Sequence, residues 1–323
     1  MALGMTLAHW VALSPAIAYF GTAFFYDAVD ALGLFPQHRI RPSDEECKKN
    51  LTSRSHVFRH MVVYHAIGTA LLLVGGEMSP PPVAKPGSVG TLEWFAVVLK
   101  AAFEWERDSS AVYYWSWILR AAYLAARQFA ALVFLDTWVF WCHYFEHQIP
   151  WLYRKIHSVH HQLYTPFPMG ALYNHPAESI VSDSMGGLLA SIVVRMTGAE
   201  QIVFFSLVTM KTVEDHAPFE LPWSPFVIFA QWTGAGVVYH NIHHQTWGLK
   251  SNYQVYFTYW DRWMNTTYKG TRTLNDKAQT SSAESYPKSF RENGVAKNGH
   301  AGTGHAGNGH MVHFKEAMVL VKE

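Results

Sequence analysis

The chain reads HYFEH at residues 143–147, HSVHH at residues 157–161 and HNIHH at residues 240–244. His175 and His216 lie between the second and third of these histidine boxes, so ten of the nineteen histidines fall in one third of the chain. Residues three or four apart share a helix face. We therefore expect the first box to direct both of its histidines to one side. In the second box, we expect His157 to face both His160 and His161.

The eight histidines of the boxes favour metal binding over a structural role. A single buried histidine is usually a satisfied core residue, but eight buried rings carry sixteen nitrogen atoms that need partners. Neutral imidazole is the commonest metal ligand and suits zinc, copper, iron and nickel. A structural zinc needs only four ligands, usually with cysteine, so this number of histidines suits two ions. No Glu-x-x-His pair of the ferritin-like kind lies at the boxes, which predicts a nitrogen-rich site.

The composition is typical of a membrane protein. Half of the 323 residues are hydrophobic and only 15% are charged, against about a quarter in an average soluble domain. The net charge is +1 and the chain has no basic stripe, so nothing favours nucleic acid as a partner. The two cysteines, Cys47 and Cys142, are too few for a disulfide framework.

Three apolar runs, residues 7–26, 57–76 and 112–142, are long enough to cross a bilayer. A further apolar block, residues 179–213, lies between the second and third boxes. If these boxes share one site, this block must cross the membrane an even number of times or not at all. We expect a hairpin of two short helices there. The pattern predicts an all-α integral membrane protein with about four transmembrane helices.

Basic residues predict the orientation in the membrane. No lysine or arginine precedes the first run, whereas six follow it closely: Arg39, Arg41, Lys48, Lys49, Arg54 and Arg59. By the positive-inside rule this loop is cytosolic and the N-terminus faces the lumen or exterior. The third run leads directly into His143, so the boxes are expected on the cytosolic face. Two irons at such a surface, open towards lipid, suggest oxygen activation and attack on an alkyl chain.

Three segments are expected along the chain. Residues 1–111 hold the N-terminal membrane helices and loops, residues 112–269 the catalytic domain, and residues 270–323 a polar tail. The tail contains GHAGTGHAGNGH, and its composition cannot bury enough apolar surface to fold, which predicts disorder.

Asp136 is a candidate for orienting the site. It lies seven residues before His143, two helical turns earlier on the same face, within the apolar stretch ALVFLDTWVFW. An acid in a membrane span suggests a function, and carboxylates often accept the second N–H of a metal-binding histidine. The alternative is an acid that snorkels or pairs along its own helix. Glu146 and Glu178 are expected to be ordinary solvated acids.

Around these residues the sequence resembles the fatty acid hydroxylase superfamily, the membrane histidine-box di-iron enzymes, and within it the sphingoid base 4-hydroxylases (sphinganine C4-monooxygenases). The resemblance covers roughly residues 120–265. The boxes alone indicate only the superfamily. GALYNHPAE at residues 170–178 and KTVEDH at residues 211–216 point to the sphingoid group. Five residues depart from the expected pattern and are candidates for lining a headgroup pocket: Tyr144, Ala217, Pro218, Asn241 and Asn265.

The resemblance implies a ligand set for two irons: His143, His147, His157, His160, His161, His240, His243 and His244, with His216 as a further ligand and His175 as a tenth candidate. It also implies O2-dependent hydroxylation of a long-chain sphingoid base, sphinganine or dihydroceramide, at carbon 4. The products would be phytosphingosine-type lipids. Electrons would come from cytochrome b5 and NADH–cytochrome b5 reductase, at the cytosolic face of the endoplasmic reticulum membrane. A homo- or hetero-oligomer in the membrane is compatible with the pattern. Arg154 and Lys155 are candidates for docking an acidic donor, although the positive-inside bias explains them equally well.

Three other functions remain open on the sequence alone. The same boxes would serve a sterol methyl oxidase, a desaturase or an aldehyde-forming alkane enzyme. A membrane metal transporter is a different class, but transporters place their ligands within spans, and these boxes lie outside the apolar runs. Haem ligation by His65 and a partner would rest on a single isolated histidine.

Overall fold

The computed structural model describes residues 5–42, 49–78, 91–103 and 110–274. These residues are helical apart from turns, loops and one isolated β-bridge between Arg39 and Phe219. The α-helices are α1 (Leu7–Ala31), α3 (Arg54–Met78), α4 (Thr91–Phe103), α5 (Ser110–Gln148), α6 (Pro150–Lys155), α7 (Pro176–Glu178), α8 (Met185–Val193), α9 (Gly198–Asp215), α10 (Pro225–Thr233), α11 (Val237–His243) and α12 (Tyr259–Trp263). Three short 3-10 turns, η2 (Pro36–His38), η3 (His157–Gln162) and η4 (Pro168–Gly170), and one π-helix, η5 (Ser179–Ser184), complete them. The predicted all-α class is confirmed.

Three of the described helices are long and apolar enough to cross a bilayer: Leu7–Ala31, Arg54–Gly75 and Ser110–Gln148. They coincide with the three predicted spans. Most of their apolar side chains are not covered by the protein, as expected where lipid is the solvent. The chain is therefore a membrane protein.

The block between the second and third boxes forms the expected pair of short helices. Its N-terminal part is η5 and α8, and α9 follows after a turn at residues 194–197. Thr197 caps α9: its hydroxyl accepts from the Glu200 N–H, and the Glu200 carboxylate accepts from the Thr197 N–H at 2.8 Å. Neither α8 nor α9 is among the three candidate spanning helices, which agrees with a block that does not cross the membrane, and the described residues hold three such helices against about four predicted.

Helix α5 carries the first box out of the apolar layer. Its 39 residues correspond to a length of about 58 Å, roughly twice the hydrocarbon thickness of a bilayer. Arg127, in the middle of the helix, does not face lipid. Its guanidinium donates to the Val194 carbonyl at 2.7 Å and pairs with Glu200 at 3.3 Å. These contacts tie α5 to the turn between α8 and α9.

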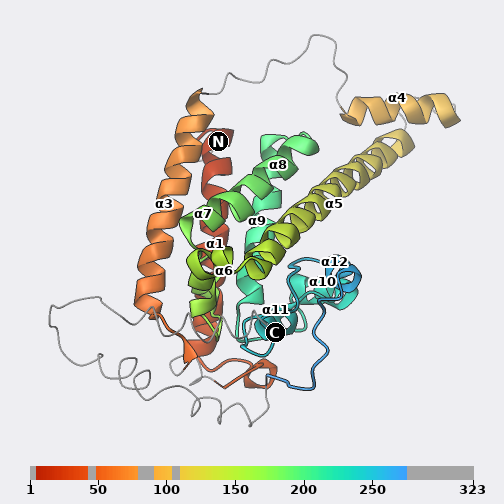
Figure 1. Ribbon diagram of the computed structural model, residues 1–323. Helices are drawn as coiled ribbons and strands as arrows, with labels where there is room; N and C mark the ends of the chain where they lie inside the picture. Colours follow the sequence, from red (N-terminus) through yellow and green to blue (C-terminus); the bar gives the residue numbers. More distant parts are fainter. Residues whose placement is uncertain (1–4, 43–48, 79–90, 104–109, 275–323) are drawn as a thin grey trace, which may run out of the picture.

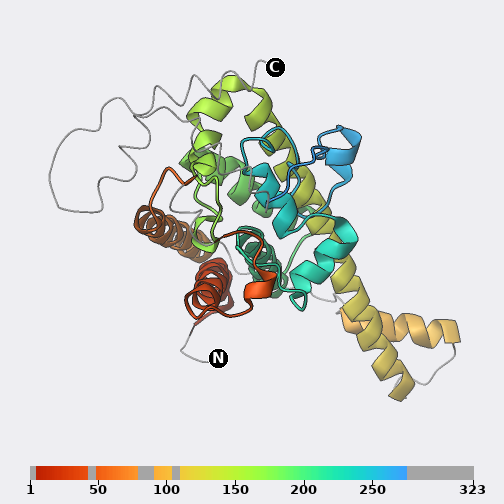
Figure 2. The ribbon, with the colours of Figure 1, turned by 90° about the horizontal axis from the view of Figure 1, so that it is seen from below.

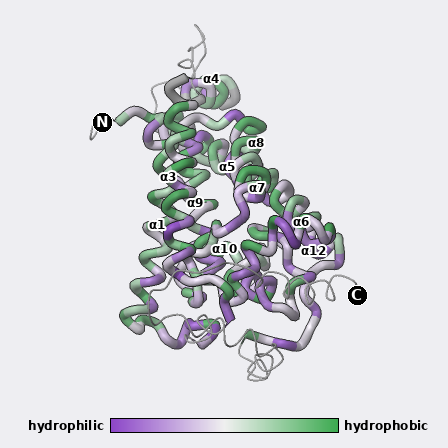
Figure 3. Tube along the Cα trace, turned by 60° about the vertical axis from the view of Figure 1, so that its left-hand side comes forward, coloured by the Kyte–Doolittle hydropathy of each residue, from purple (hydrophilic) through white to green (hydrophobic). Residues whose placement is uncertain are grey.

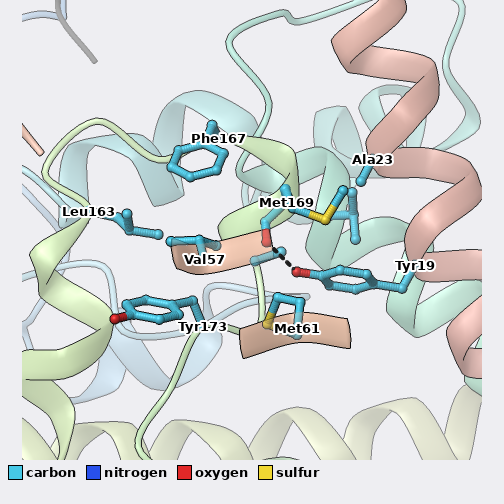
Figure 4. Close-up of a cluster of buried hydrophobic side chains, with 10 residues drawn as sticks. Tyr19, Ala23, Val57, Met61, Leu163, Phe167, Met169 and Tyr173 are labelled. Atoms are coloured by element: carbon cyan, nitrogen blue, oxygen red, sulfur yellow. Dashed lines mark hydrogen bonds between the residues drawn. The ribbon is translucent and has the colours of Figure 1, made fainter. Parts of the chain in front are cut away.

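Helices α1, α3 and α9 pack together, and α5 runs diagonally away from them towards α4 (Figure 2). A buried cluster joins this bundle to the segment after the second box (Figure 4). There the Tyr19 hydroxyl of α1 donates to the Met169 carbonyl at 2.6 Å, and Val57 and Met61 of α3 pack alongside. The membrane bundle therefore supports the loop that leads from the second box to the GALYNHPAE segment.

The hydrophilic and hydrophobic parts of the molecule separate along the helix axes (Figure 3). The N-terminus of α1 lies at the opposite end of the molecule from α11 (Figure 1). The loop after α1 lies at the α11 end, because the Asn50 side chain exchanges two hydrogen bonds of 2.8 Å with the backbone of Thr165, next to the second box. The proposed domain boundaries stay predictions, and most of the predicted tail, residues 275–323, lies outside the described residues.

Candidate metal centre

Nine histidine side chains gather into two neighbouring groups. The five-histidine group contains His143, His147, His157, His161 and His243, and the four-histidine group contains His160, His216, His240 and His244. Within each group the candidate ligand atoms lie within 4.8 Å of one another. All nine side chains are buried. The structure thus brings together nine of the ten predicted ligands.

The second and third boxes each contribute to both groups. The outer pair of the second box enters the five-histidine group, while His160 enters the other. In the third box, His240 and His244 enter the four-histidine group, while His243 enters the five-histidine group. The expectation that His157 faces both of the later histidines of its box was therefore wrong for His160. Adjacent residues of the 3-10 helix η3 point roughly 120° apart, which directs His160 and His161 to different sites.

Backbone carbonyls orient four of the rings through Nδ1. The pairs are His143 with Tyr253 at 2.7 Å, His243 with Ser251 at 2.7 Å, His244 with Leu163 at 2.8 Å and His216 with Thr212 at 2.8 Å. A carbonyl can only accept, so Nδ1 must carry the ring proton in each pair. Each Nε2 then presents a lone pair, which is the form of imidazole that binds metal.

The lone pairs of His216 and His244 both face His240, whose single ring proton can satisfy only one of them. The Nε2 atom of His240 lies 3.1 Å from Nε2 of both His216 and His244. In the other group, Nε2 of His143 and of His243 is buried without any hydrogen-bond partner. Buried, unpaired acceptors are unfavourable unless a cation binds them. The donor set therefore fits one metal ion in each group.

Burial keeps these imidazoles neutral. It lowers the pKa of His157, His160 and His161 well below the ordinary value, and neighbouring histidines lower it further. Burial likewise lowers the pKa of His216 to about 4. Protonation would compete with metal binding, so these shifts favour the metal-binding form at neutral pH.

The two groups are close enough to act on one substrate atom. The ring centroids of His160 and His244 are 4.7 Å apart within the four-histidine group, and those of His161 and His244 are 5.0 Å apart across the two groups. A cavity of about 70 Å³ adjoins both groups. It is lined by His143 and His157 from one group and by His160, His216 and His240 from the other. A molecule in this cavity would contact both metal sites.

The segments that suggested sphingoid chemistry form walls of this cavity. Ala171, Leu172, Asn174 and Glu178 come from GALYNHPAE, and Thr212, Asp215 and His216 come from KTVEDH. None of the five residues that depart from the expected pattern lines it. Asn241, for example, donates to the carbonyls of Asp215 and Val237. These five residues do not line this cavity, and their role in a headgroup pocket stays a prediction.

Comparison with known proteins agrees with this geometry. The family described as "Fatty acid hydroxylase" matches residues 128–266. A sphingolipid C4-hydroxylase of Saccharomyces cerevisiae is 34% identical over 88% of this chain and 79% of its own length. The chain belongs to the fatty acid hydroxylase family. Sphinganine C4-monooxygenase 2 of Arabidopsis thaliana is 32% identical over 73% of this chain and 79% of its own length.

Similarity to other activities of the fatty acid hydroxylase family is more local. A cholesterol 25-hydroxylase-like protein of Danio rerio is 32% identical over only 43% of this chain. No solved structure matches the chain. The matched residues of the family include all ten candidate histidines and Asp136, and the buried histidine groups are consistent with iron binding in this family.

Asp136 in this fatty acid hydroxylase was expected to bond to a metal-binding histidine, but it binds a loop that in turn orients such a histidine. It is fully buried, and its carboxylate accepts from the Gln254 side chain and, at 2.8 Å, from the Tyr256 N–H. His143 donates instead to the Tyr253 carbonyl in the same loop. Asp136 therefore holds the loop that orients His143. The expected direct hydrogen bond from His143 to Asp136 is not formed, because His143 donates to the loop instead.

Two acids that the sequence assigned to solvent are buried in the site. Glu178 accepts from His157 Nδ1 at 2.9 Å, and Glu146 lies 3.5 Å from the same atom. Burial, with Glu146 and Asp183 nearby, raises the pKa of Glu178 well above its ordinary value. A carboxylate–histidine pair of this kind orients metal ligands in many proteins. The position of Glu146 inside the first box was the available signal.

His175 is not part of either histidine group. It lies at the start of α7, half-buried, and its Nδ1 accepts from the Ala177 N–H at 3.2 Å. The ring caps the helix in this arrangement.

Proposed function

We propose that this protein hydroxylates a long-chain sphingoid base at carbon 4, in sphingolipid biosynthesis. The observation that carries the proposal is the cavity shared by both histidine groups, whose walls include the two segments typical of sphingoid base hydroxylases. The names of the two relatives that match most of the chain support the same reaction. The cholesterol hydroxylase-like relative matches less than half of the chain, so sterol oxidation is not favoured.

Nine histidines would hold two irons, five at one site and four at the other. His175 remains a weaker candidate for a tenth ligand because its Nδ1 caps α7. Bound iron supplies reduction of O2 by two electrons, with one oxygen atom entering a C–H bond and the other leaving as water. The remaining work belongs to the chain: it positions one methylene of a flexible lipid and excludes water.

Apolar cavity residues fit this positioning role. Val139, Ala171, Leu172 and Val255 line the cavity beside the histidines. These four side chains carry no hydrogen-bonding groups, so an alkyl chain can lie against them without displacing a polar partner. Neutral rings held by carbonyls keep the site geometry fixed while the lipid binds and leaves.

The electron donor that we propose is cytochrome b5 with its NADH-dependent reductase. Arg154 and Lys155 in α6 lie directly before the second box, and Lys155 is exposed. A basic pair close to the metal sites suits an acidic donor protein. This role requires an active site on the cytosolic face of the endoplasmic reticulum membrane, and we include a homo- or hetero-oligomer of the intact enzyme in the proposal.

Expression in a host that lacks 4-hydroxylated bases tests the proposal. We expect mass spectrometry of the extracted lipids to reveal trihydroxy long-chain bases. An iron-loaded, folded protein that is supplied with its electron donor and yields only unchanged dihydroxy bases would contradict it. Hydroxylated sterols in the same extract would support the alternative instead.

A further inference from the structure

The cavity beside the histidine groups contains buried acceptors that the metal centre does not use. Glu178 accepts from His157 through Oε1, but its Oε2 has no partner. Asn174 also lines the cavity, and its Oδ1 has no partner. Each side chain is only 5% exposed. Buried acceptors without donors are rare in folded proteins, and here they indicate a ligand that donates hydrogen bonds.

Acidic side chains gather on the same wall of the cavity, and burial raises the pKa of Glu178 and Asp183, so a cation beside them would favour their charged forms. Glu146, Glu178 and Asp183 all line it, and within the described part of the chain no lysine or arginine forms an ion pair with any of them. Asp215, a fourth acid of the cavity lining, does have a cationic partner, because it pairs with Lys211 at 2.5 Å. The imidazole of His157 separates Glu178 from the metal site, because Glu178 binds Nδ1 and the metal site lies at Nε2. This wall therefore favours a cationic ligand.

A π-helix shapes this wall. The η5 segment, Ser179–Ser184, follows Glu178 directly and carries Ser182 and Asp183 into the lining. π-Helical turns are rare and are frequently found at functional sites. Asn174 donates from Nδ2 to Asp183 at 2.9 Å, which leaves its carbonyl oxygen as the free acceptor. The polar wall is thus held together by its own contacts.

The chemistry of the substrate places a cation in this cavity. In a free long-chain base, only one carbon separates the carbon that bears the amine from carbon 4. A molecule that presents carbon 4 to the two histidine groups must therefore place its amine beside them. The protonated amine has three N–H donors, and the wall offers Glu178 Oε2, Asn174 Oδ1 and the Asp183 carboxylate. N-acylation would remove the charge and leave a single N–H donor.

We propose that Glu178, Asp183 and Asn174 form an amine seat that binds the protonated headgroup of the free base and discriminates against its N-acylated form. This inference rests on the proposed function. It names the form of substrate and the residues that select it.

Equilibrium binding to the iron-loaded protein in lipid nanodiscs tests the amine seat. Without oxygen or reductant no turnover occurs, so sphinganine and N-acetylsphinganine can be compared directly. We expect wild-type protein to bind sphinganine at least tenfold more tightly, a typical effect of one charge-assisted hydrogen bond. Asp183→Asn should weaken sphinganine binding about tenfold and leave N-acetylsphinganine unchanged, with iron content preserved. Glu214→Gln, a buried acid outside the cavity, is the matched control and should change neither affinity.

Equal affinity of the wild-type protein for both ligands would overturn the amine seat, whether or not the variants fold. A variant that keeps its iron but weakens both ligands equally, or neither, would overturn it as well. Product analysis separates this outcome from failure of the proposed function. If both lipids are hydroxylated equally at carbon 4, the function stands and the seat fails. If neither is hydroxylated, the function itself fails.

Discussion

At the scale of single residues, the metal sites depend on what each imidazole binds through its second nitrogen. Leu163, Ser251, Thr212 and Tyr253 contribute only carbonyl oxygens, yet these fix which ring nitrogen is free. Ser251 and Tyr253 belong to one loop, so the four carbonyls come from three segments, and the rings depend on the placement of three separate parts of the chain.

Removing a ligand should remove iron. We expect His240→Ala to retain fewer than two irons per chain and to lose more than 100-fold in activity, beyond the 10–100-fold typical of residues that only support a ligand. His175→Ala is the matched control. It should keep both irons, because its ring caps α7 rather than joining a histidine group. Elemental analysis of the purified variants measures the iron content of each. Loss of iron from His175→Ala would show that His175 is a tenth ligand.

Asp136 should contribute to stability and to activity together. Asp136→Asn places an amide N–H against the Gln254 and Tyr256 donors. A buried donor left unpaired costs about 1–3 kcal/mol. We expect a lower unfolding temperature in detergent and about tenfold lower activity, since the loop that orients His143 loosens. Asp30→Asn, in a partly exposed pair with Arg39, should cost less than about 1 kcal/mol. Equal effects of the two changes would contradict this role.

At the scale of elements, close contact between α5 and α8 positions the π-helix beside the histidines. A Cβ atom on Gly186 would lie 2.6 Å from Cδ1 of Trp138, and Trp138 donates to the Val181 carbonyl of η5 at 2.9 Å. Only glycine permits this approach. The wall of the cavity therefore depends on a residue that is not itself part of the wall.

Gly186→Ala should separate α8 from α5. We expect a loss of about 1–3 kcal/mol from overpacking, with weaker substrate binding as η5 shifts. Gly21→Ala in α1 is the matched control, because nothing lies within 4 Å of its added Cβ. That change should raise helix stability by about 0.5–1 kcal/mol. Thermal unfolding of both variants in the same detergent decides between these expectations, and a neutral Gly186→Ala would refute the packing argument.

At the scale of the whole molecule, the basic loop and both histidine groups share one end of the bundle, and the N-terminus lies at the other. Asn50 is the first residue of a glycosylation sequon, but its side-chain amide already exchanges two hydrogen bonds with the backbone of Thr165. We expect Asn50 to carry no glycan and a sequon engineered at the N-terminus to be glycosylated in the endoplasmic reticulum. A mobility shift on endoglycosidase treatment detects a glycan at either site. A glycan on Asn50 would show that the orientation in the membrane is the opposite of the predicted one.

Much of this architecture could be predicted from sequence, because local spacing determines it. The three long apolar runs and the histidine boxes need only periodicity and length. The division of His160 from His161, the burial of Glu146 and Glu178, and the π-helix could not be predicted. Each depends on how α5, α8 and the loop after the second box pack together. The same packing explains why Asp136 supports a loop 118 residues away rather than the nearby His143.

The proposed function requires that an oxygen atom from O2 enters carbon 4 of a long-chain base at a centre of two irons held by nine histidines. Supplying oxygen-18 gas to cells that express the protein in a host without 4-hydroxylated bases tests it most directly. Mass spectrometry should locate one heavy oxygen at carbon 4 in every newly made trihydroxy base. A light oxygen at that carbon, derived from water, or heavy oxygen at a different carbon would contradict the account.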